Sequence, residues 1–193
     1  MTNILQIPES LQFYFENAQQ AGAIQQILEM DSLPLGLTWE EIEYYSMAKL
    51  SAQTTQLDYW LFSKKLWEST WGQEERFIKN YQEVEPEWYE NENTVDNVWG
   101  EDTFYKAFYY KDDNIIVFHV SIYPKEGSLL SFYIRSPEDT YETSNNLNLS
   151  ENWHASEDDE RRIKKGLDIC GKKEIDISPL IESAKEVLNA LGI

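Results

Sequence analysis

The chain has 193 residues, of which 41% are hydrophobic and 14% aromatic, and its formal net charge is −19 at pH 7. A chain of this length can bury enough surface to fold without a metal or a disulfide, and its one cysteine, Cys170, excludes an internal disulfide. The negative charge disfavours nucleic acid and anionic membranes as direct partners, because phosphate groups would be repelled.

The first residues have neither the basic region nor the apolar region of a signal peptide. No stretch approaches the roughly 18 consecutive apolar residues that a membrane-spanning helix needs. We therefore expect a cytoplasmic protein that does not contact a membrane.

Helical spacing of apolar residues dominates residues 1–81. Ser10 is placed to cap a first helix that extends to about Met30, and a break containing a proline and a glycine follows. Thr38 and Glu41 have the spacing of a capping box, in which each side chain binds the other residue's backbone amide. A second helix is therefore expected to begin at this point.

The second helix either continues past Thr54 and Thr55 or bends there, and its apolar positions extend to Trp67. A short third helix is expected over 73–81. The next segment, 82–102, reads as an acidic connector, because eight carboxylates and no lysine or arginine occur between Glu83 and Asp102.

The period of the apolar pattern changes to two after the connector, which indicates β-strands. Three strands are expected at about 103–111, 115–123 and 128–135, joined by turns rich in Asp, Asn, Pro and Gly. One face of the middle strand is wholly apolar, while the other face is mixed and carries His119. The mixed face suits a half-covered surface or a binding face.

The remaining segment, 137–193, is expected to contain a polar loop and two helices. A charged helix is expected over 156–165, because acids precede bases and pair with them four residues apart, and Gly166 would end it. Ser178 and Pro179 then predict the cap and first turn of a last helix that extends to about Leu191.

These elements predict a single α+β domain over 1–193. It comprises a helical part (1–81), the acidic connector (82–102), a sheet (103–136), and a loop with C-terminal helices (137–193). We expect an N-terminal helical layer, an antiparallel meander of three to four strands, and a C-terminal helix packed on the sheet.

No catalytic or metal-binding motif is convincing. Residues 166–173 match the G-x-x-x-x-G-K pattern of a phosphate-binding loop, but a charged helix is expected before them and Lys173 stands where a Ser or Thr should bind magnesium. The pattern is better explained as a helix-ending glycine and a basic turn. His119, His154 and Cys170 are too few donors, at no recognisable spacing, for a zinc site. The sequence predicts no metal and no cofactor.

The acidic connector is the strongest functional signal, because Tyr and Trp are frequent interface anchors and carboxylates attract Lys and Arg on a partner. Residues 1–100 hold 17 acids and 5 bases, net −12, and residues 101–193 hold 18 and 11, net −7, so the negative charge is concentrated in the N-terminal half. The candidate partner-binding residues share this segment: Glu83, Glu85, Glu87, Trp88, Tyr89, Glu90, Glu92, Asp96 and Trp99.

The hypothesis that follows is a non-catalytic acidic protein that inhibits a basic protein, such as a toxin or a nucleic-acid enzyme, by occluding its active site. The resemblance to immunity proteins and nucleic-acid mimics is one of class only. Three alternatives stay open. The connector is a solvated link with its tryptophans in the core, the protein is an enzyme with a site on the mixed sheet face around His119, or it is a scaffold whose acidity serves solubility.

Overall fold

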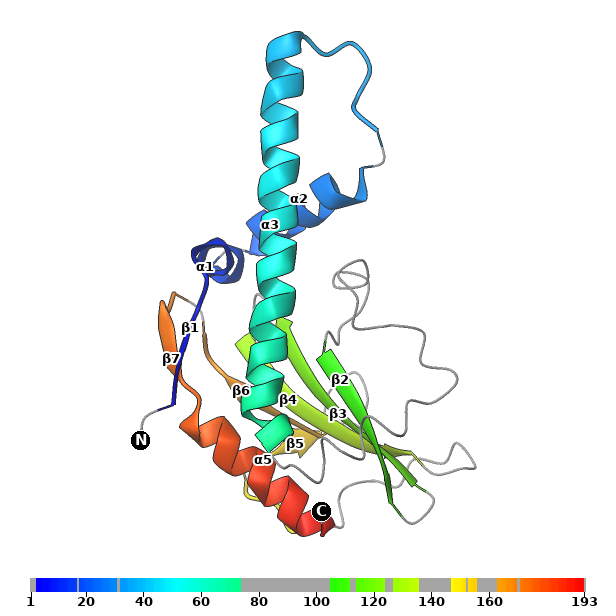
Figure 1. Cartoon of the computed structure of the whole chain (residues 1–193), viewed down its shortest axis with the longest axis vertical. Helices are drawn as coiled ribbons and strands as arrows, with labels where there is room; N and C mark the ends of the chain where they lie inside the picture. The colour runs from blue at the N-terminus through cyan, green and yellow to red at the C-terminus, as the bar shows by residue number, and fades with distance from the viewer. Residues whose placement is uncertain are drawn as a thin grey trace.

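The structure of this chain is a computed structural model. It describes residues 3–16, 18–30, 32–73, 105–111, 114–123, 127–135, 147–151, 153–155, 163–169 and 171–192. Within these residues, helices combine with antiparallel sheets (Figure 1), which confirms the mixed α+β class.

The N-terminal segment begins with a strand that the sequence did not suggest, β1 (Ile4–Gln6), followed by α1 (Glu9–Glu16) and α2 (Ala18–Glu29). The prediction that Ser10 caps the first helix is wrong. The backbone amides of Leu11 and Gln12 both donate to the carbonyl of Pro8, so the first turn begins directly after the proline. The Ser10 hydroxyl lies inside the helix and donates to the carboxylate of Asp58 on the next long helix.

That long helix is α3 (Trp39–Ser69), and the 3₁₀ turn η1 (Trp71–Gln73) follows it. The predicted capping box is confirmed, because the Thr38 amide donates to the Glu41 carboxylate at 2.7 Å and the Glu41 amide donates to the Thr38 hydroxyl at 3.3 Å. The helix is a single element of 31 residues without a break at Thr54 or Thr55. The hydroxyl groups of both threonines donate to carbonyls one turn back, which satisfies them inside the helix.

The larger sheet has the strand order β2-β3-β4-β6-β5, and every neighbouring pair is antiparallel. Its strands are β2 (Tyr105–Lys111), β3 (Asn114–Tyr123), β4 (Gly127–Arg135), β5 (His154–Ala155) and β6 (Ile163–Leu167). The apolar face of β3 is in the core, since Ile116, Phe118 and Val120 are all buried.

The predicted charged helix over 156–165 is wrong at its C-terminal end, because residues 163–167 form β6. Ile163 pairs with Phe132 of β4, and the pairing continues through Lys164 and Lys165. Ion pairs four residues apart add only about 0.2–0.5 kcal/mol each to a helix. Pairing with the free edge of a long strand outweighs this local preference.

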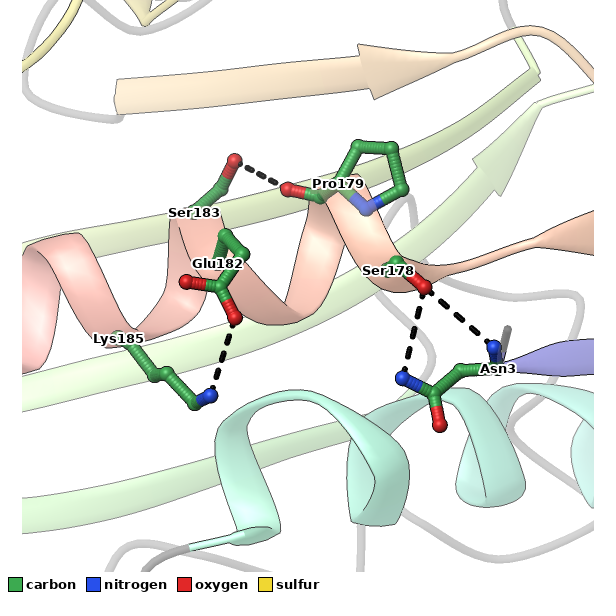
Figure 2. A network of polar contacts seen from close by, with 6 residues as sticks. All are labelled: Asn3, Ser178, Pro179, Glu182, Ser183 and Lys185. Carbon is green, nitrogen blue, oxygen red and sulfur yellow. Dashed lines mark hydrogen bonds and ion pairs between the residues drawn. The ribbon is translucent and has the colours of Figure 1, made fainter. Parts of the chain in front are cut away.

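The C-terminal helix α5 (Ser178–Leu191) and the strand before it, β7 (Glu174–Asp176), are joined to the N-terminus. β1 and β7 form a two-stranded antiparallel sheet, and the Ile177 amide donates to the carbonyl of Asn3 at 2.9 Å. Figure 2 shows that the Ser178 hydroxyl oxygen accepts from the amide and side chain of Asn3, at 3.4 and 3.5 Å. The prediction that Ser178 caps α5 is therefore wrong, and Ile177 occupies the cap position without a side-chain hydrogen bond.

The core joins α3, η1, the larger sheet and α5. Its most deeply buried side chains include Trp71, Phe118, Leu66 and Leu180. The Trp71 ring lies 5.0 Å from the Phe118 ring and 6.2 Å from the Trp153 ring, measured between centroids. This aromatic cluster connects the end of α3 to the sheet.

Candidate protein-binding surface

The candidate partner-binding residues of the acidic connector lie outside the described residues. This applies to Glu83, Glu85, Glu87, Trp88, Tyr89, Glu90, Glu92, Asp96 and Trp99. The expected short helix over 73–81 also lies outside them, apart from Gln73 at the end of η1. Gln73 and Tyr105 are the described residues that flank the segment 74–104.

Before the segment, the chain is held in place by Trp71 of η1. This side chain is 0% exposed, and its indole N–H donates to the backbone carbonyl of His119 at 2.9 Å. Gly72 is held equally tightly, because a Cβ atom there would lie 2.8 Å from Cζ3 of Trp67. Two consecutive residues are thus packed against the core immediately before the segment begins.

The residue that follows the segment, Tyr105, is the first residue of β2. Tyr105 pairs with Val120 of β3, the residue that follows His119. Both ends of the segment 74–104 are therefore attached at neighbouring residues of one buried strand. β2 is also the first strand in the order of the larger sheet, so this segment leads directly into an edge strand.

The alternative enzymatic site depends on His119 facing an open surface. His119 is 1% exposed, although it belongs to the mixed face of β3, so the sheet is covered at this position. A buried imidazole of this kind is a packed side chain rather than the wall of an open cleft. The structure does not describe the side chains of Ser121, Tyr123, Tyr133 and Arg135, which would complete such a site.

The phosphate-loop pattern at 166–173 does not have the strand–loop–helix context that such a loop needs. Gly166 lies inside β6, and Gly171 takes a left-handed conformation with φ of 67° in the turn that leads to β7. The Lys172 ammonium group donates to the Asp168 carbonyl at 2.7 Å, and this hydrogen bond joins the two ends of the turn. The expectation of a basic turn is confirmed, but a strand precedes it and not a helix.

A cluster that the sequence analysis missed surrounds Glu186 of α5. Its carboxylate accepts hydrogen bonds from the amide and hydroxyl of Ser150 and from the indole N–H of Trp153, the last at 3.2 Å. Three donors on one carboxylate hold Ser150 and Trp153 against α5. Helical periodicity signals only the apolar face of α5, so no local pattern could have identified this polar contact.

In the part of the chain that the structure describes, three groups have a pKa that departs from its ordinary value. The backbone amide of Thr38, followed by its hydroxyl, lowers the pKa of the Glu41 carboxyl. The hydroxyl of Ser178, followed by its amide, lowers the pKa of the Asp176 carboxyl. Burial raises the pKa of the Tyr14 hydroxyl. Each of these shifts has a structural cause, namely a helix cap, a turn or a packed ring.

Among the described residues, no group of three or more His, Cys, Asp or Glu side chains could hold a metal ion. None of the helices described combines the length and the apolar character that crossing a membrane requires. No protein-family model, curated protein or solved structure matches this chain.

Proposed function

We propose that this protein is a cytoplasmic, non-catalytic inhibitor that binds a basic protein through the acidic connector 82–102 and occludes its active site. A toxin or a nucleic-acid enzyme is the class of partner that fits. Glu83, Glu85, Glu87, Glu90 and Glu92 supply the acidic rim, and Trp88 and Tyr89 supply the anchors. Asp96 and Trp99 complete the partner-binding residues.

The observation that carries the proposal is the attachment of the two ends of this segment. The indole N–H of Trp71 donates a hydrogen bond to the His119 carbonyl of β3, and Tyr105 of β2 pairs with Val120 of β3. These two contacts place both ends of the segment beside one strand, β3. The eight carboxylates from Glu83 to Asp102, in a protein of net charge −19, would speed the encounter with a cationic partner by about 10- to 1,000-fold.

The proposal includes the finer architecture expected from the sequence. An N-terminal helical layer and the C-terminal helix support an antiparallel meander of three to four strands, and the acidic connector enters this meander at its edge strand. In this arrangement the sheet and the helices serve as a rigid support, and the connector carries the recognition.

Two other functions compete with this one. Catalysis on the mixed face of the sheet is disfavoured by the 1% exposure of His119. A scaffold that is acidic only for solubility makes a different prediction, because its binding would not depend on particular carboxylates.

The decisive experiment combines affinity purification from the native cell with charge neutralisation. The chain should recover a basic protein, and binding should weaken from low to high salt. Substituting Glu83, Glu85, Glu87 and Glu90 with Gln should weaken it further, mostly through the association rate.

The matched control neutralises four exposed acids elsewhere, namely Glu9, Glu29, Glu151 and Glu182. It changes the net charge equally, so a general effect of charge would make the two variants alike. An acidic partner, affinity that salt leaves unchanged, or equal losses in both variants would overturn the proposal.

A further inference from the structure

The connection between α2 and α3 presents large apolar side chains to solvent. Leu35 is 101% exposed, Trp39 is 87% exposed and Leu33 is 43% exposed. We call these three residues the apolar tip. The N-terminal end of α3, where this connection joins it, projects well beyond the larger sheet (Figure 1). Exposed apolar side chains that gather at one place mark a surface that binds another molecule, whereas scattered ones need no explanation.

The apolar tip is held by contacts on both of its sides. Before it, Met30 at the end of α2 is joined to α3 twice: its carbonyl accepts from the Lys49 ammonium group at 2.8 Å, and its sulfur accepts from the Tyr45 hydroxyl at 2.8 Å. After it, the capping box at the start of α3 fixes the backbone next to Trp39. An anchor that is already positioned loses less entropy when it binds a partner.

The charges of the chain around the apolar tip have a single sign. Residues 1–48 contain no Lys, Arg or His, and their seven acids are Glu9, Glu16, Glu29, Asp31, Glu40, Glu41 and Glu43. The first basic side chain, Lys49, lies about 15 Å from Trp39 along α3. The next two on this helix are Lys64, which is ion-paired with Glu68 at 3.9 Å, and Lys65. Both lie about 37 Å or more from Trp39, far beyond the Debye length of about 8 Å.

Two exposed carboxylates flank the Trp39 side chain on α3. Glu40 follows Trp39 directly, and Glu43 lies four residues from Trp39, the spacing that places two side chains on the same side of a helix. One oxygen of Glu40 accepts from the Tyr44 hydroxyl at 3.5 Å. The third acid of this turn, Glu41, is used in the capping box. Carboxylates in such positions accept charge-assisted hydrogen bonds from Lys and Arg of a partner.

We propose that the apolar tip docks on a basic protein: Leu35 and Trp39 enter an apolar pocket, and Lys or Arg side chains at its rim pair with Glu40 and Glu43. Charge complementarity selects this occupant. A second copy of this chain would bring acids against acids at the tip, and so would an anionic membrane. A neutral apolar surface would remove water from the two carboxylates without replacing their hydrogen bonds.

The apolar tip and the acidic connector are separate surfaces. Trp39 and Ser69, the first and last residues of α3, lie roughly 45 Å apart, and the segment that contains the connector follows the Ser69 end. Docking through the apolar tip agrees with the class of partner proposed above, but it depends only on described residues. Either surface can therefore fail without the other.

Photo-crosslinking in the native cell identifies the occupant. A photoreactive amino acid replaces Leu35 in the full chain, and we expect an adduct with a basic protein. The matched control carries the same amino acid at Leu61, which is 48% exposed near the other end of α3 and should not give this adduct. An adduct with an acidic protein, with lipid or with a second copy of this chain would overturn the proposal, and so would the absence of any adduct.

Affinity measurements with the purified basic protein then test each part of the surface. Leu35→Ser and Trp39→Ser should each weaken the complex by at least about 10-fold, because each removes an apolar anchor. Replacing Glu40 and Glu43 together with Gln should lower the association rate by roughly 3- to 10-fold and reduce its salt dependence. The matched control replaces two exposed acids elsewhere, Glu9 and Glu151, and should leave the rate nearly unchanged. Circular dichroism of each variant verifies that α3 stays folded.

Two further results would overturn the proposal. They are a complex that tolerates both Leu35→Ser and Trp39→Ser, and equal effects of the two charge variants. The variant with four Gln substitutions in the acidic connector separates this inference from the proposed inhibitory function. If that variant weakens binding to a basic protein and the apolar-tip variants do not, the inhibitory function stands and this inference fails. The reverse result retains the apolar tip and removes the connector.

Discussion

Replacing Trp71 with Phe tests a buried contact between η1, which follows α3, and the sheet. The substitution keeps an aromatic ring in the cluster with Phe118 and Trp153 but removes the indole N–H that donates to the His119 carbonyl at 2.9 Å. Because Trp71 is 0% exposed, water cannot replace the lost donor. We expect the free energy of unfolding to fall by about 2–4 kcal/mol, from the lost hydrogen bond and the cavity together.

Trp153→Phe provides the matched comparison. It deletes the same atoms from the neighbouring ring, so the cavity contributions are similar. The hydrogen bond it removes is longer, at 3.2 Å, and its acceptor Glu186 is half-buried and retains the Ser150 donors. Trp153→Phe should therefore cost about 1–2 kcal/mol, less than Trp71→Phe.

Urea unfolding followed by circular dichroism measures both costs, provided that the slope of the transition is unchanged in each variant. Equal costs, or a greater cost for Trp153→Phe, would refute the reasoning that the buried indole bond fixes the end of α3 on β3. Partner binding adds a second measurement, because a loosened Trp71 also releases one attachment point of the acidic connector.

Three further predictions concern two glycines and the cap of α3. Gly72→Ala should destabilise the fold by about 1–3 kcal/mol in urea unfolding, because the added Cβ lies 2.8 Å from the Trp67 ring. Gly171→Ala should cost about 1 kcal/mol in the same assay, since φ is 67° there but no atom lies within 4 Å of the added carbon. The capping box predicts a pH dependence: the pKa of Glu41 in the folded state is lowered, so its stabilisation is present above the ordinary value of 4.5 and is lost as the pH falls through the lowered pKa. Helical content measured against pH should show this loss near the start of α3. Thr38→Ala should reduce the dependence but not abolish it, because the backbone amide, which is the larger cause, remains, whereas Glu41→Gln should abolish it.

Local sequence patterns predicted features that depend on a few neighbouring residues. The reciprocal spacing of Thr38 and Glu41 identified the start of α3, because both partners of a capping box lie within one turn. Strict alternation identified Ile116, Phe118 and Val120 as core residues. The mixed α+β class followed from the change of period from helix to strand.

Features that depend on distant residues were missed for a physical reason. Lys164 and Lys165 follow a run of acidic residues whose spacing favours a helix. Both residues nevertheless pair with β4 and belong to β6. Ser178 has the sequence context of a helix cap, but its hydroxyl oxygen accepts from Asn3, 175 residues away. No local pattern contains such a partner, so local propensity alone could not predict either outcome.

The acidic connector could be detected from the sequence alone. Its signal is a run of acidic and aromatic residues that are neighbours along the chain, so no folded contact is needed to recognise it. The exposed apolar side chains of α3 are different, because their exposure depends on which face of the helix the core uses. Met47, Leu50, Leu57 and Leu61 look like core residues in the sequence, but the structure buries Tyr59, Phe62 and Leu66 on the other side of the helix and leaves these four exposed.

The net charge of −19 sets how the proposed inhibitory complex responds to salt. Attraction between the acidic connector and a basic partner weakens as salt screens it, since the Debye length is about 8 Å at physiological ionic strength. A scaffold that is acidic only for solubility would bind its partners without dependence on particular carboxylates. A salt titration of the unmodified chain beside the variant in which Glu83, Glu85, Glu87 and Glu90 are replaced by Gln therefore separates the two functions, because the inhibitor should lose much of its salt dependence in the variant and the scaffold should not.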